Sequence, residues 1–457
     1  MARDRLKAWG IGVFCLACLG PAVASRAADA PGKSFVLDNG LRVFLYEKHE
    51  IPLLHVVTGF NVGSKDESEA TSGLVHLLEH AILFRGASAR AGAGTGAEIR
   101  RHGAYFNGHT GQDLSVFEIS LPSAEADFAL RNQKEILFGM ELGQEELDRE
   151  KDIILEELGQ MEDDPERRSL DLVLQALFPG HPYGRSVYGR TEVIEAATVE
   201  DLFAFYRRFF VADNCALAVV GDFECAEIER KVREVFGPLP RTGFARPEFP
   251  MAGPLKKGSS RRLGRDVRGG YLTIGYAAPD YNHPDQYAMN VLVEALGRGV
   301  NPFLAAYLHG VRNSVQSVSM AYLPLRYGGA AIVTIEADPK DLAAVERAAV
   351  AFLKRSGGES YSKKDFADPE AERAAFDYLE MAKNQIRFAA GRADESGLQL
   401  AGALVRHMLL NTREEPGRYL DGIGRVDSGD LRKAAGRYLG RGDCAAVSIV
   451  PAPEGKR

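Results

Sequence analysis

The segment His76-Leu77-Leu78-Glu79-His80 contains the residue types of a metal site at helical spacing. On a helix, residues i and i+4 share one face, so both imidazoles can reach a single ion. Glu79 lies on the same side, where its carboxylate can take a proton from a nearby water, while Leu77 and Leu78 point away. The alternative is that two ordinary histidines flank an unrelated glutamate. The five residues do not decide between these interpretations.

A third ligand has to come from elsewhere, because a catalytic zinc ion usually takes three protein ligands and one open position. The spacing of apolar residues predicts a helix over 144–163. On it Glu150 and Glu157 lie two turns apart and face the same way. Glu156 is the rival, but it points about 100° away from Glu157. A solvated acidic surface is the alternative, since other carboxylates lie close by.

These residues resemble the pitrilysin/insulinase family, in which His-x-x-Glu-His is followed by a glutamate ligand on a later helix. The family's ligand maps to Glu157, and another family glutamate maps to Glu150. The resemblance implies one zinc ion per chain, bound by His76, His80 and Glu157. It also implies that Glu79 is the catalytic base, that Glu150 orients a ligand, and that the substrate is a peptide or an unfolded polypeptide segment.

Other segments extend the resemblance over most of the chain. Residues 105–110, YFNGHT, are similar to a family strand of pattern Asn-Ala-aromatic-Thr that pairs with substrate backbone. This implies substrate binding by Phe106, Asn107 and Gly108, although Gly108 and His109 depart from the pattern. Residues 61–67, 180–185 and 214–223 also match family motifs. His102, His109 and His181 are expected in loops or turns, without a metal role.

The second half of the chain is more divergent. At the place equivalent to the zinc helix it has Val291, Leu292, Val293 and Glu294, so one metal site per chain is expected. Arg312 matches a family arginine that contacts substrate, but the family's accompanying tyrosine falls near a serine. An ordinary charge at a helix end is the equal alternative for Arg312.

An internal repeat predicts two similar domains. Residues 201–217 and 430–446 match without gaps, and Cys215 falls on Cys444. Each segment reads as a helix that runs into a strand. A stretch rich in proline and basic residues separates the halves and predicts a linker over 237–269 with little structure of its own. The predicted domains are therefore 33–236, which holds the zinc site, and 270–457, which holds none.

The expected fold class is α+β, because strands adjoin strands before helices follow. Strands are predicted over 41–47, 53–61 and 115–121, and a helix over 72–83. The family resemblance implies that each domain is an antiparallel sheet flanked by helices, and that the domains face each other as a clamshell.

The N-terminus predicts export. Three basic residues precede a short apolar run that ends in Ala22-Val23-Ala24, so residues 1–28 read as a signal peptide and the protein as periplasmic or secreted. Cys18 allows a weak lipid-anchor alternative. Three cysteines would remain, too few for a disulfide framework. A net charge of −7 without long basic runs gives no sign of a nucleic-acid partner.

Two other functions stay open. The family also contains inactive chains that assist an active one, so this chain could be a catalytically weak partner subunit. It could also be a binding protein without chemistry. The resemblance further allows a homodimer, or a heterodimer with a related chain.

Overall fold

The computed structural model describes residues 32–84, 95–298, 302–356, 369–411 and 418–453. The predicted signal peptide lies outside the described residues. The chain forms two compact units that interrupt each other along the sequence. The first contains the described residues up to Leu158 with Arg185–Glu248 and Ala390–Arg418; the second contains Gly159–Gly184, Phe249–Ala389 and the described residues from Tyr419.

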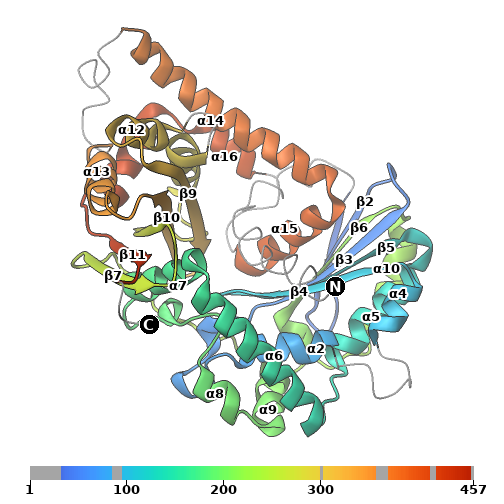
Figure 1. Ribbon diagram of the computed structural model, residues 1–457. Helices are drawn as coiled ribbons and strands as arrows, with labels where there is room; N and C mark the ends of the chain where they lie inside the picture. The colour runs from blue at the N-terminus through green and yellow to red at the C-terminus, as the bar shows by residue number, and fades with distance from the viewer. Residues whose placement is uncertain (1–31, 85–94, 299–301, 357–368, 412–417, 454–457) are drawn as a thin grey trace. The chain divides into compact units, whose positions relative to one another are not determined.

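The first unit is built on a six-stranded sheet of order β1-β2-β6-β3-β5-β4 (Figure 1). Neighbours pair antiparallel except β2 and β6, which are parallel. β4 forms one edge of the sheet. The strands are β1 (Gly32–Val36), β2 (Arg42–Glu47), β3 (Leu53–Phe60), β4 (Tyr105–Thr110), β5 (Ser115–Pro122) and β6 (Cys215–Gly221).

Helices cover both faces of this sheet (Figure 1). One face forms the main apolar core with α2, α5, α9 and α10, and the other face carries α15. The helices of the unit are α2 (Leu74–Phe84), α4 (Thr95–Arg101), α5 (Ala126–Phe138), α6 (Gln144–Asp163, whose last residues fall in the second unit), α8 (Thr191–Ala196), α9 (Val199–Phe209), α10 (Cys225–Phe236) and α15 (Gly397–Leu410).

The second unit has a five-stranded sheet of order β7-β11-β8-β10-β9, again with one parallel pair, β7 with β11. Its strands are β7 (Ser259–Arg265), β8 (Gly270–Ala278), β9 (Val315–Leu325), β10 (Gly328–Ala337) and β11 (Ala445–Pro451). Its helices are α7 (Pro165–Leu177), α11 (Gln286–Val293), α12 (Phe303–Val311), α13 (Leu342–Arg355), α14 (Pro369–Glu395, whose end reaches the first unit), α16 (Tyr419–Arg425) and α17 (Ser428–Ala434). No described helix is long and apolar enough to cross a membrane.

In each sheet, a helix from the other half of the sequence packs against a glycine of one strand. A Cβ on Gly59 of β3 would lie 2.4 Å from Val405 of α15, and one on Gly275 of β8 would lie 2.5 Å from Val173 of α7. Both contacts need a residue without a side chain. The predicted domains, 33–236 and 270–457, did not include this exchange, because packing between distant segments leaves no local pattern.

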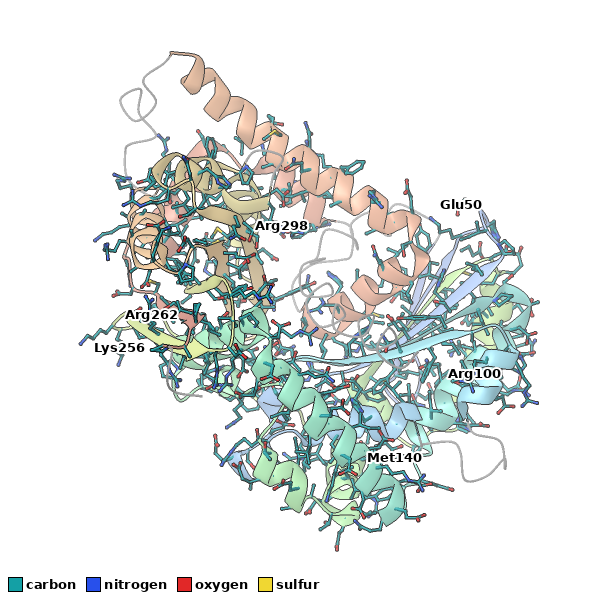
Figure 2. All side chains as sticks on the ribbon, viewed as in Figure 1. Glu50, Arg100, Met140, Lys256, Arg262 and Arg298 are labelled. Atoms are coloured by element: carbon teal, nitrogen blue, oxygen red, sulfur yellow. The ribbon has the colours of Figure 1, made fainter. Side chains whose placement is uncertain are left out.

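Most predicted elements are present, with three corrections. The helix predicted over 72–83 begins at Leu74, because Gly73 has a φ of +100°. The sheets are not wholly antiparallel, since each contains one parallel pair. The linker predicted to lack structure contains β7, which pairs with β11 and whose partly buried Leu263 packs on the core; exposed Arg262 of this edge strand is labelled in Figure 2.

The two segments of the predicted internal repeat begin with the same kind of helix cap. α9 begins with a reciprocal pair of bonds between Thr198 and Asp201, and α17 begins with the same pair between Asp427 and Asp430. Each helix leads to a strand, β6 or β11. Such capping boxes satisfy backbone N–H groups at a helix start, so the repeat preserves the residues that define the helix.

Candidate metal centre

Two helices of the first unit bring the predicted ligands together. His76 and His80 lie one turn apart on α2, and Glu157 lies on α6. The Nε2 atoms of His76 and His80 are each 3.6 Å from Oε2 of Glu157. Among the described residues, these three form the one group of His, Cys, Asp or Glu side chains close enough to hold an ion, with ligand atoms within 4.8 Å of one another.

This donor set fits zinc in type and spacing. Two imidazole nitrogens and one carboxylate oxygen are the ligands of several catalytic zinc sites. With metal–ligand bonds of about 2.1 Å, tetrahedral ligand atoms lie about 3.4 Å apart. The two separations of 3.6 Å between the histidines and Glu157 are close to that value. An ion could therefore bind here with only small side-chain movements.

Burial and charge affect the two histidines differently. His76 is nearly buried, and burial lowers its pKa, which favours the neutral imidazole that binds metal. Burial also lowers the pKa of His80, but the carboxylates of Glu150 and Glu157 outweigh this effect and raise the pKa to about 9. Without metal, His80 therefore carries a proton that an incoming ion must displace.

Glu150 lies where a ligand-orienting residue is expected. Its side chain is 1% exposed, and Oε2 lies 3.6 Å from Nδ1 of His80, the ring nitrogen opposite the one that faces Glu157. Glu156, the rival ligand, is exposed. The three glutamates therefore differ in position as the helical spacing predicts: Glu157 lies beside both histidines, Glu150 lies beside His80 alone, and Glu156 is exposed.

Glu79 lies buried between α2 and the edge strand β4. A Cβ on Gly108 would lie 3.2 Å from Cγ of Glu79 and 2.9 Å from a methyl group of Leu83. The small residue at 108, which departs from the family pattern, therefore lets the strand run against the side chain of Glu79. Phe106 is partly buried against the core. Asn107 and Tyr105 lie on the other face of the strand, where the Nδ2 group of Asn107 donates to the hydroxyl of Tyr105.

Several functional candidates differ from expectation or were missed. His109 is not in a loop: it lies on β4, with Nε2 3.4 Å from buried Glu118. Arg312 ends α12 in the second unit, where its Nε lies 3.8 Å from Asp341, so its substrate role stays a prediction. Glu67 was not predicted as a functional residue, although its carboxyl group accepts a hydrogen bond from the N–H of Val75 in the first turn of α2. An acidic residue shortly after a predicted strand does not indicate such a contact.

Comparisons with known proteins identify the class. Residues 43–191 match the family model described as Insulinase (Peptidase family M16), and residues 196–368 match the one described as Peptidase M16 inactive domain. The chain belongs to the pitrilysin/insulinase family, peptidase family M16.

Relatives span most of the chain. A protein of Mycobacterium leprae named as an uncharacterized zinc protease is 29% identical over 66% of this chain and 68% of its own. A probable mitochondrial-processing peptidase subunit beta of Schizosaccharomyces pombe is 25% identical over 92% of this chain and 91% of its own. The crystal structure of a Helicobacter pylori protease has the same fold, with a TM-score of 0.81 at 20% identity over 92% of this chain and all of that chain.

Proposed function

We propose that this protein is a zinc-dependent endopeptidase that hydrolyses peptides or unfolded protein segments. The observation that carries the proposal is the convergence of His76, His80 and Glu157 beside the buried carboxylate of Glu79. The relatives named as zinc proteases support zinc as the metal.

A zinc ion held by His76, His80 and Glu157 would act as the Lewis acid that activates water and polarises the scissile carbonyl. Glu79 accepts a proton from the attacking water and later delivers it to the leaving amine. Glu150 holds the ring of His80 in orientation. The residues of the chain thus bind the ion, fix one ligand and move one proton.

The edge strand β4 supports an extended substrate. Among the described strands it pairs only with β5, so the backbone groups on its other side are available to a peptide strand. Phe106, Asn107 and Gly108 would then bind the substrate backbone. Folded proteins rarely offer such a strand, which favours unfolded segments.

Replacing Glu79 with glutamine tests the proposal. The variant should bind one zinc ion per chain, while peptide hydrolysis falls about 10²–10⁴-fold, the usual contribution of a general base. His76→Ala and His80→Ala should lose both zinc and activity. Zinc content and turnover of an unstructured peptide, with and without chelator, are measured on the same preparations. Full activity in Glu79→Gln would refute the mechanism.

The second candidate is a catalytically weak partner subunit. The relative named as a mitochondrial-processing peptidase subunit beta favours the partnership in this candidate, because that name describes one chain of a larger enzyme. We propose assembly with a second chain, a copy of itself or a related one, as part of this alternative. Zinc-loaded wild-type protein that hydrolyses no peptide until a related chain is added would support it.

Export to the periplasm or the medium also stays a proposal, tested by N-terminal sequencing of protein from the native host.

A further inference from the structure

The start of the histidine-bearing helix lacks an ordinary cap. The residue before α2 is Gly73, which has no side chain to accept the N–H groups of the first turn. A capping residue such as serine would not fit, because φ is +100° and a Cβ would lie 2.9 Å from Cα of Gly189. The cap must therefore come from another part of the chain.

Glu67 supplies it from eight residues upstream. Its Oε1 accepts a hydrogen bond of 2.9 Å from the N–H of Val75, the residue directly before His76. The side chain of Glu67 is buried, and besides Val75 its carboxyl group interacts with the N–H of Gly73 and with the charge of Arg185. Burying a carboxyl group is unfavourable even with such partners, so helix stability is a weak explanation for its presence.

The residues before Glu67 are fixed to the turn that follows β4. The N–H groups of Ser64 and Lys65 donate to the carbonyls of Gly111 and Gln112, each at 3.1 Å. Lys65 is 1% exposed, and its ammonium group donates to the carbonyl of Asp113 at 2.8 Å. One short segment, 63–67, is therefore bonded at one end to the turn after the edge strand and at the other end to the first turn of α2.

We propose that Glu67 is a positioning residue for the metal centre, which fixes His76 relative to β4 through its bond to Val75. The inference rests on the proposed function, because it concerns zinc binding by His76. Among the described residues, Glu67 is hydrogen-bonded neither to the proposed ligands nor to β4; it acts through the backbone of α2. The length of the side chain is the property that matters, since it must span the loop 68–72.

Three variants separate the effect of the side-chain length of Glu67 from the effect of its charge. Glu67→Gln keeps the length and an oxygen acceptor, and it should bind zinc close to the wild-type affinity. Glu67→Asp keeps the carboxylate but is one methylene shorter, and Glu67→Ala removes the acceptor. Both should weaken zinc binding about 10–100-fold, the usual effect of losing a residue that supports a ligand. Dissociation constants are measured by competition with a chromophoric chelator.

Asp427→Ala is the matched control, because Asp427 caps α17 in the second unit through an acidic side chain. It should lower the melting temperature and leave zinc affinity unchanged. Equal zinc affinity in wild type, Glu67→Asp and Glu67→Ala would overturn the inference, as would equal weakening in the control or a Glu67→Gln protein as weak as Glu67→Asp. If Glu67→Ala does not fold, the other two variants decide. Wild-type protein that binds no zinc would overturn the proposed function as well.

Discussion

Replacing Glu150 with glutamine tests whether a buried carboxylate outside the ligand set orients His80. Oε2 of Glu150 lies 3.6 Å from Nδ1 of His80, and the side chain is 1% exposed. Loss of such a partner typically lowers metal affinity or activity about 10–100-fold. This corresponds to about 1.4–2.7 kcal/mol of binding free energy. We therefore expect zinc to bind Glu150→Gln more weakly by that factor.

The size of the loss should depend on pH, because the same carboxylate stabilises a proton on His80. Burial lowers the pKa of His80, but Glu150 and Glu157 raise it to about 9 in the metal-free protein. Wild-type zinc affinity should therefore rise with pH up to about 9, as the competing proton leaves. Without the charge of Glu150 the pKa of His80 falls, and the competition ends at lower pH. The deficit of the variant should be largest at alkaline pH and smaller at neutral pH.

Competition with a chelator across a pH series measures both effects. Glu156→Gln is the control, because it removes the same charge from the same helix at an exposed position. It should leave zinc affinity and its pH dependence almost unchanged. Equal affinities of wild type and Glu150→Gln at every pH would refute the reasoning. Equal weakening in both variants would show that the charge of the helix acts, rather than contact with His80.

Two further predictions concern the same region. Glu157→Gln should lose zinc while Glu156→Gln keeps it, because Oε2 of Glu157 lies 3.6 Å from both histidines; metal analysis of the two proteins checks this, and the reverse result would contradict the ligand assignment. Burial raises the pKa of Glu67 to about 8 from an ordinary 4.5, so its contribution to stability is present below pH 4.5 and is lost as pH rises through about 8. The melting temperature of wild type relative to Glu67→Gln should fall over that range, and a constant difference would contradict the shift.

The sequence predicts how the candidate ligands face where these residues lie close together on one helix. His76 and His80 share a face by spacing, and the same periodicity separates Glu157 from Glu156. That α6 meets α2 could not be worked out from spacing, because the contact joins distant parts of the chain; it was expected only through resemblance to a family. The structure brings the three residues together.

Glu67 and His109 show what the sequence leaves undetermined. The bond from Val75 to Glu67 depends on the fold of the intervening loop and on Gly73 having a positive φ, and neither is encoded in a repeating pattern. His109 was expected in a loop or turn because the family resemblance gives it no metal role, yet it lies in an edge strand beside buried Glu118. Glycine often breaks strands, but here Gly108 allows the strand to approach the side chains of Leu83 and Glu79 closely.

The two halves of the chain indicate that different residues determine the fold and the site. The capping residues Thr198 and Asp201 have counterparts in Asp427 and Asp430, and a strand glycine in each sheet accepts a helix. The histidines have no counterpart in α11, which nevertheless forms a helix. A helix at this place in the repeat therefore does not depend on metal ligands, so His76→Ala and His80→Ala should fold and lose zinc. Their loss of activity can then be attributed to the metal rather than to unfolding.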